Sequence, residues 1–358
     1  METHKTMNSE IENGRMLHYD LLRILACFSV VMLHSAAQFW YTIPVTEPEW
    51  VIANSYDAVS RFGVPIFVMI SGVLFLNNDR EINLKRLYTH NILRMIVLFL
   101  VWSCFYGLFD CRRYQWSEIS YREVLQEIMM SRYHLWFLQM IVGIYMLLPI
   151  LKKWLANASR KNVEYFLLLF LIFQVGRETI YALERWPFAV FLMDTVRIDM
   201  VCGYLGYFVL GYYIAHYGID KRWHKWIYAG GIIGAVANIL LGNVLAISAG
   251  IAKGNIYDSF GVFTFMMVVA LFLFFTEKVS RVRFSKKAAG LIQELSLATL
   301  GIYLLHLGFI EFLEPYGFHS MMFSPVLCIP AFAVVCFGAC FLISAMVRRI
   351  PFVGRYLC

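Results

Sequence analysis

Two ionisable residues, Arg23 and His34, lie inside the first long apolar segment of the chain. Ionisable side chains are costly within a membrane, so those that occur there often bind substrates or take part in reactions. Over the eleven residues that separate these two, an α-helix returns almost to the same face and rises by ~16 Å. One helix face would therefore carry a permanent cation near one membrane surface and a titratable base deeper in the bilayer. This arrangement suits a site that holds an anionic group at one end and reacts at the other.

Each of the two residues has a functional and a structural interpretation. An imidazole at the depth of His34 would be mostly neutral, so it could accept the proton of a hydroxyl nucleophile. The alternative is a histidine that only bonds a neighbouring helix. The guanidinium of Arg23 is shaped to bind phosphate. Alternatively, it extends to the lipid headgroups or pairs with Asp20, one helical turn earlier.

The composition excludes a soluble globular domain. Of the 358 residues, 60% are hydrophobic and 15% charged, and the mean hydropathy is +0.63. Several apolar stretches approach or reach the ~20 residues that a helix needs to cross a bilayer. The sequence therefore predicts an all-α integral membrane protein, a bundle of about ten transmembrane helices. The spans are expected at residues 19–39, 60–77, 87–109, 134–151, 163–180, 199–216, 225–246, 258–276, 291–311 and 323–347.

The distribution of basic residues predicts the orientation. With ten spans, most of the 31 Lys and Arg residues lie on the same side as both ends of the chain, so both termini should be cytoplasmic. Residues 1–18 would form a cytoplasmic N-terminal tail without a cleavable signal peptide, 19–347 the membrane domain, and 348–358 a short basic cytoplasmic tail. The net charge of +7 fits a basic face against membrane lipids and calls for no nucleic acid.

The connections between the spans differ in length. The longest are expected on the outer side, at 40–59, 110–133 and 181–198, and residues 117–130 have the spacing of an amphipathic helix on the outer membrane surface. The eight cysteines fall mostly within spans, which argues against a structural disulfide. The sequence has no metal-ligand spacing, phosphate-binding glycine loop or dinucleotide fingerprint, so we expect no metal.

Five segments, in order along the chain, resemble the motifs of one family, the acyltransferase 3 family of membrane acyltransferases. Together they extend from residue 19 to about residue 310, nearly the whole membrane domain. They are Asp20-x-x-Arg23-x-x-Ala26 with His34, the stretch 63–72 with Ser71 and Gly72, the basic residues Arg86 and Arg94, the stretch 134–138 with Tyr145 and Pro149, and the stretch 300–306.

The resemblance implies a multi-pass membrane enzyme. Members of the family transfer acetyl or other acyl groups from acyl-coenzyme A to sugars of surface polysaccharides, to lipids or to small metabolites. For this chain it implies acetyl-CoA, or another acyl-CoA, as the donor. It also implies an outward-facing hydroxyl of a carbohydrate or lipid-linked sugar as the acceptor, and a place in a bacterial plasma membrane. A homo-oligomer is a further partner to test for.

The same resemblance assigns roles to the donor side. His34 and Arg23 would be catalytic, and Arg23, Arg86, Arg94 and Ser71 would bind the donor. With α-helical spacing, Arg86 and Arg94 would share one face of the third span through His90. The alternatives are a helix end that meets lipid headgroups and a serine that bonds only its own backbone. The family's tighter Arg-x-x-Arg spacing is not found here, which weakens the assignment of Arg86 most.

On the acceptor side, His306, His134, Trp136 and Tyr303 are candidates for acceptor binding or for stabilising the oxyanion. His306 should reach a depth similar to that of His34. Packing histidines and an aromatic belt at the membrane surface are the structural alternatives.

The main functional alternative is a membrane transporter or substrate-binding module without chemistry, since intramembrane Arg and His also line permeation paths. The absence of paired broken helices argues against transport.

Overall fold

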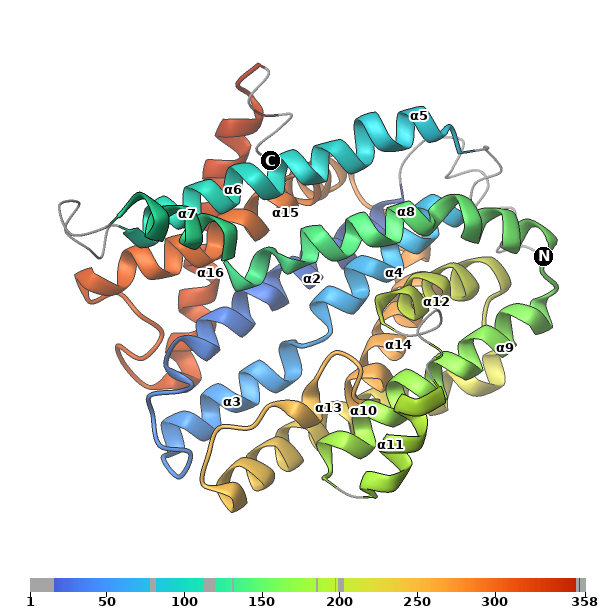
Figure 1. Cartoon of the computed structure of the whole chain (residues 1–358), viewed down its shortest axis with the longest axis horizontal. Coiled ribbons are helices and arrows are strands. Elements are labelled where there is room, and N and C mark those ends of the chain that lie inside the picture. The colour runs from blue at the N-terminus through green and yellow to red at the C-terminus, as the bar shows by residue number, and fades with distance from the viewer. Residues whose placement is uncertain are drawn as a thin grey trace.

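The computed structural model describes residues 16–77, 82–111, 120–130, 132–184, 186–196, 198, 203–351 and 354, and every regular element in these ranges is a helix (Figure 1). The α-helices are α2 (Leu17–Ala36), α3 (Pro48–Ser60), α4 (Gly63–Leu76), α5 (Leu84–Arg86), α6 (Leu93–Cys111), α7 (Tyr121–Met130), α8 (Trp136–Asn157), α9 (Arg160–Phe170), α10 (Arg177–Ala182), α11 (Pro187–Val196), α12 (Tyr204–Tyr217), α13 (Lys221–Ala249), α14 (Val262–Glu277), α15 (Lys286–Leu313) and α16 (Pro325–Arg348). The short helices include η1 (Ala37–Phe39), η2 (Leu87–Ile92), η3 (Tyr133–Leu135), η4 (Leu171–Gly176) and η6 (Asn255–Tyr257).

The predicted class, an all-α integral membrane protein, is confirmed. The described residues contain eight helical stretches that are long and apolar enough to cross a membrane. The two other predicted spans, 163–180 and 199–216, do not meet this standard. The first coincides with α9, η4 and α10 and contains Glu164, Arg177 and Glu178; the second is represented by α12, which has 14 residues. The count of ten spans therefore stays a prediction.

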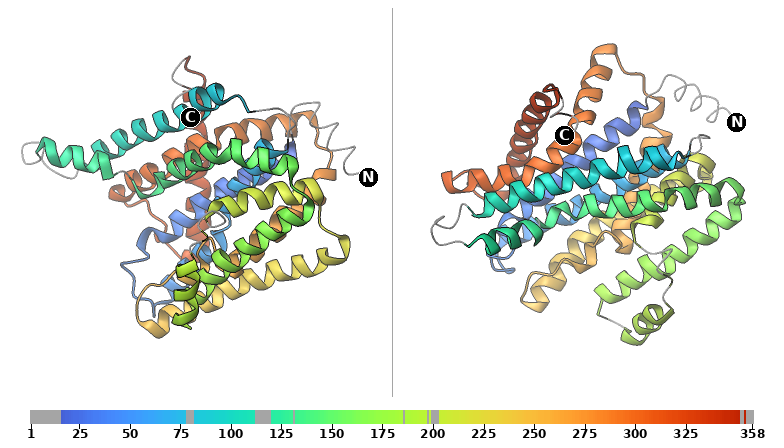
Figure 2. Two further views of the ribbon diagram at one scale, coloured as in Figure 1. Left: turned by 45° about the vertical axis from the view of Figure 1, so that its right-hand side comes forward. Right: turned by 45° about the horizontal axis from the view of Figure 1, so that its top comes forward.

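Helix α2 lies at the centre of the bundle and packs against α3, α4, α15 and α16 (Figure 1). Its residues are apolar or small on most sides, and Leu22, Ala26 and Val31 are completely buried. In both views of Figure 2 the long helices α6 (cyan) and α8 (green) run side by side, whereas α16 (red) is steeply inclined to them. We call the end of the bundle where α2 begins the inner end and the end near Ala36 the outer end.

One predicted connection is wrong. Residues 40–59 were expected to be a loop, but α3 begins at Pro48 and continues into α4 with a break only at Arg61 and Phe62. Together α3 and α4 form one apolar stretch of 29 residues. Helix α3 was not predicted because it carries several polar side chains. Two of these, Asn54 and Asp57, are nevertheless buried against neighbouring helices. The amphipathic helix predicted for 117–130 is present, where the structure describes it, as α7.

Two glycines allow α4 and α12 to pack backbone against backbone. A Cβ atom on Gly72 would overlap the carbonyl oxygen of Phe208 in α12, and one on Gly211 would overlap that of Met69 in α4. Close approach through small residues is a common way for helices to associate in membranes, where packing replaces the hydrophobic driving force.

We expect Gly211→Ala to destabilise the protein by about 1–3 kcal/mol, because the added methyl group forces these two backbones apart. The measurement is the thermal unfolding midpoint in detergent. Gly143→Ala in α8 is the matched control, since its Cβ would meet no atom within 4 Å. Equal midpoints for the two variants would contradict this account of the α4–α12 contact.

Candidate active site

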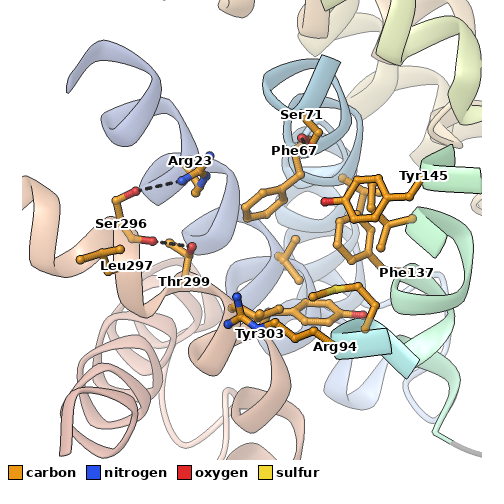
Figure 3. A pocket seen from close by; sticks show the side chains of 15 residues that line it. Arg23, Phe67, Ser71, Arg94, Phe137, Tyr145, Ser296, Leu297, Thr299 and Tyr303 are labelled. Carbon is orange, nitrogen blue, oxygen red and sulfur yellow. Dashed lines mark hydrogen bonds between the residues drawn. The ribbon is translucent and has the colours of Figure 1, made fainter. Parts of the chain in front are cut away.

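A cavity of about 290 Å³ lies between α2, α4, α6, α8 and α15 (Figure 3). Its size is near the lower limit of small-ligand pockets, ~300 Å³. Four of the predicted site residues line it: Arg23 from α2, Ser71 from α4, Arg94 from α6 and Tyr303 from α15. These residues are far apart in the sequence, so the cavity joins the first, second, third and ninth predicted spans.

Arg23 is anchored by a small polar network at the wall of this cavity. Its Nη1 atom donates to Ser296 Oγ at 3.4 Å and lies 3.7 Å from Asp20 Oδ1. Ser296 Oγ in turn donates to Asp20 Oδ1 at 2.5 Å. The Arg23 side chain keeps 27% of its surface exposed. Its orientation is therefore fixed by α15 and by Asp20, while part of the guanidinium faces open space.

Arg94 and Ser71 complete the polar part of the lining. Tyr145 of α8 also lines the cavity and lies close enough to Arg23 and Arg94 to interact electrostatically with both. The cavity is thus lined by two cations, Arg23 and Arg94, that come from different helices. Ser71 donates its hydroxyl to the carbonyl of Phe67, one turn earlier in α4, at 2.9 Å. This bond agrees with a structural role for Ser71, although the side chain still borders the cavity.

Arg86 does not line this cavity. It is exposed at the end of α5, and the six residues that follow form a π-helix, η2. A π-helix bonds residues five apart, so it turns side chains away from the positions that α-helical spacing predicts. For this reason Arg86 and His90 are exposed while Arg94 turns inward, and the predicted stripe of three basic residues on one helix face is not formed.

Three predicted histidines meet beyond Tyr303, toward the outer end. The ring centroids of His34 and His306 are 5.0 Å apart, and those of His134 and His306 are 5.6 Å apart. Tyr133 of η3 places its hydroxyl 3.3 Å from Nδ1 of His34. Among the described residues, no three His, Cys, Asp or Glu side chains are arranged to hold a metal ion. In this cluster the His306 ring therefore contacts the rings of His34 and His134, and the three imidazoles are not arranged around a metal ion.

The three imidazoles differ in accessibility and in hydrogen bonding. His134 and His306 are 2% and 0% exposed, whereas His34 is only partly buried. Nδ1 of His306 lies 2.6 Å from the carbonyl oxygen of Tyr303, which can only accept, so this nitrogen carries the proton. Nε2 of a neutral His306 then accepts rather than donates. His306 would therefore stabilise an oxyanion only after taking up a proton. The structure fits the oxyanion role predicted for His306 less well than a role as a buried neighbour that packs against His34.

Tyr303 connects the cavity to the histidines. Its ring lines the cavity, its hydroxyl donates to the backbone carbonyl of His134, and its own carbonyl binds His306. Trp136 lies outside this cluster: its ring is 40% exposed and 5.4 Å from the ring of Tyr204 in α12. The structure thus brings together seven of the nine predicted site residues in two adjoining groups, with Trp136 at the edge and Arg86 apart from both.

Sequence reasoning missed three residues at this site: Ser296, Tyr133 and Tyr145 as a neighbour of both arginines. A signal existed for Ser296, because it precedes Tyr303 by seven residues, two helical turns on the same face. Tyr133 directly precedes His134. The contact of Tyr145 with two cations depends on the packing of α8 and has no local signal.

The comparison with protein families decides the assignment. A family model described as "Acyltransferase domain" matches residues 17–345. The chain belongs to the acyltransferase 3 family. It is therefore a multi-pass membrane acyltransferase, which favours an enzyme over the transporter alternative. No curated protein and no solved structure matches the chain. The family match includes the cavity and the histidine cluster of this acyltransferase.

Proposed function

We propose that this acyltransferase moves an acyl group, acetyl in the simplest case, from a cytoplasmic acyl-CoA to a hydroxyl of an outward-facing carbohydrate or lipid-linked sugar, in a bacterial plasma membrane. The observation that carries the proposal is the order of groups along the bundle. Two arginines and Tyr303 line the cavity, and the carbonyl of Tyr303 bonds His306 of the histidine cluster. An anionic donor held at one end would thus place its reactive group near an imidazole.

The charge of the cavity and the apolar part of its lining support this donor. Arginine binds phosphate through charge-assisted hydrogen bonds, and Arg23 and Arg94 both face this space. Apolar side chains such as Val30, Phe67 and Ile141 supply the rest of the lining. Such a lining suits the pantetheine arm and acyl group, and the ~16 Å rise between Arg23 and His34 is comparable to the length of that arm.

In the proposed reaction, His34 acts as the general base because, of the three clustered histidines, it is the one that a substrate can reach. The imidazole takes the proton of the acceptor hydroxyl as its oxygen attacks the thioester carbonyl. When the tetrahedral intermediate collapses, the carbon–sulfur bond breaks, and the coenzyme A thiolate takes the proton from the imidazolium. The Tyr133 hydroxyl at Nδ1 orients the ring.

Calorimetric titration of the detergent-purified protein with acetyl-CoA tests the donor site. We expect Arg23→Ala to weaken binding at least ~10-fold, because a hydrogen bond to a charged group contributes ~1.5–3 kcal/mol. Arg86→Gln is the matched control and should bind like wild type, since Arg86 lies outside the cavity. If a folded wild-type protein does not bind acetyl-CoA, or if Arg86→Gln loses binding as Arg23→Ala does, the proposed donor site is wrong.

A further inference from the structure

A second buried ion pair lies at the outer end of the bundle, where α3 meets α4. Nη2 of Arg61 donates to Oδ2 of Asp57 at 2.7 Å. Asp57 is 1% exposed, whereas 30% of the Arg61 side chain is exposed, so the pair borders open space on the arginine side. Neither residue has a role in the reaction described above.

The pair keeps hydrogen-bonding capacity that the protein does not use. Within the described ranges, the buried atoms Oδ1 of Asp57 and Nε of Arg61 have no hydrogen-bond partner. Leaving an acceptor and a donor without a hydrogen bond at a buried position destabilises the protein, and more so when the groups are charged. An i,i+4 pair that only stabilised the end of α3 would not need to leave both atoms without a partner. Their presence on neighbouring residues indicates a partner that accepts one bond and donates another.

The surroundings hold this pair rigidly. The Arg61 guanidinium lies 5.1 Å from the centre of the Tyr257 ring, and the Tyr257 hydroxyl donates to Oδ1 of Asn54 at 2.5 Å. Asn54 is fully buried and also bonds Trp40 and Asn243 at 2.9 Å each. This network joins four segments of the chain and holds the Tyr257 ring in place beside the Arg61 guanidinium. A ligand would therefore meet groups that are already oriented.

The pair is also near the reactive end of the site. Helix α3, which carries Asp57, packs against α2, and Arg61 interacts electrostatically with His34. Arg61 likewise interacts with Tyr204, whose ring is 5.4 Å from that of Trp136. An ion pair, an aromatic surface and the proposed base thus lie together at the outer end, where an acceptor would enter.

The charge balance favours an acceptor without a net charge. Asp57 neutralises Arg61, which also interacts with the carboxylate of Asp258. Asp258 interacts in turn with Glu178, whose carboxylate pairs with Arg177. An anionic acceptor would therefore meet carboxylates around a cation that is already paired. Neighbouring hydroxyl groups, in contrast, can each donate one hydrogen bond and accept another.

We propose that Asp57 and Arg61 form an acceptor subsite that binds adjacent hydroxyls of an uncharged saccharide, with the carboxylate accepting from one hydroxyl and the guanidinium donating to the next. Trp136 and Tyr204 supply the apolar face on which the sugar ring rests. The subsite holds the hydroxyl that is to be acylated toward His34. This inference rests on the proposed function and narrows it to uncharged sugars.

The test compares maltotriose with trigalacturonic acid as acceptors of labelled acetyl groups from acetyl-CoA. We expect transfer to maltotriose, and we expect Arg61→Gln and Asp57→Asn to raise its KM roughly tenfold or more with little change in kcat. Because one unpaired buried charge can prevent folding, the double variant with both substitutions is measured too, since two amides preserve the shape of the pair. Lys253→Gln is the matched control, an outer cation paired with Glu184.

The inference is overturned if maltotriose is not acetylated, if trigalacturonic acid is the better acceptor, or if the folded double variant keeps the wild-type KM. Acetyl-CoA binding and the release of coenzyme A in water are measured on the same samples. Intact donor binding and turnover with an unchanged KM would refute the subsite and leave the proposed acyl transfer standing. Absent donor binding would refute the proposed function itself.

Discussion

Replacing His34 with alanine should lower the rate of acyl transfer ~10²–10⁴-fold, the usual contribution of a general base. The reason is structural: of the three clustered imidazoles, His34 is the accessible one, and the other two are almost completely buried. The measurement is the single-turnover rate of labelled acetyl transfer from acetyl-CoA. Binding of acetyl-CoA should stay within a few-fold of wild type, because the arginines that line the cavity are unchanged.

Two further histidine variants make this test specific. His224→Gln removes an imidazole that bonds the carbonyl of Ile219 at the start of α13, and it should transfer at the wild-type rate. His306→Gln removes the buried neighbour of His34 and should lower the rate less than His34→Ala does, since it acts through the orientation of His34. If His34→Ala turns over normally while it remains folded, or if His306→Gln is the more damaging variant, His34 is not the base.

The sequence could predict the relative positions of those site residues that lie on the same helix. Arg23 and His34 both belong to α2, so their separation follows from helical geometry alone. The same holds for Tyr303 and His306, which are one turn apart in α15. Their apolar surroundings then predict which segments are buried in the membrane, because composition and length suffice for that conclusion.

What sequence could not predict depends on contacts between helices or on local departures from regular helix. The π-helix η2 turns Arg86 away from Arg94, and no feature of residues 87–92 predicts a π-helix there. Helix α3 was hidden because Asn54 and Asp57 look like loop residues, although both are buried by tertiary contacts. The meeting of His134 with His306 likewise requires η3 and α15 to be neighbours, which a single sequence does not show.

The groups of the site follow the same order along α2 and along α15. Helix α2 carries Arg23 into the cavity and His34 into the histidine cluster, and α15 follows the same course with Ser296 at one end and His306 at the other. Each of these two neighbouring helices thus carries, in the same order, a polar residue of the Arg23 network, apolar residues that line the cavity, and an imidazole. The proposed donor, bound along both helices, would have its reactive end positioned near the imidazoles.

An ion network of three residues, Arg132, Glu311 and Asp110, lies next to the histidine cluster at the outer end of the bundle. The Nη1 and Nη2 atoms of Arg132 donate to the two carboxylate oxygens of Glu311 in α15 at 2.9 and 2.5 Å, and Nη2 also binds Asp110 of α6 at 2.5 Å. The Arg132 side chain is only 15% exposed. Because Arg132 is two residues before His134, this network sets the position of η3 relative to α6 and α15.

We therefore expect Arg132→Gln to destabilise the protein by ~3 kcal/mol or more, the usual cost of removing one partner from a buried ion pair. The substitution leaves two carboxylates close together without the cation that now joins them. Thermal and denaturant unfolding in detergent measure this loss. Acyl transfer should fall as well, because η3 would no longer hold Tyr133 and His134 against His34 and His306.

Two comparisons separate this effect from the loss of any arginine. Arg160→Gln breaks the exposed pair with Glu164, whose side chains are 53% and 45% exposed, and should cost no more than ~1 kcal/mol. Adding Glu311→Gln to Arg132→Gln should restore part of the lost stability, since it removes one of the two unpaired carboxylates. If Arg132→Gln costs no more than Arg160→Gln, or if the second substitution makes the loss greater, the network does not hold the outer end together. In that case the position of His134 beside His306 must come from the packing of Tyr106 and Tyr303 around its ring, which lie 4.9 and 5.7 Å from it.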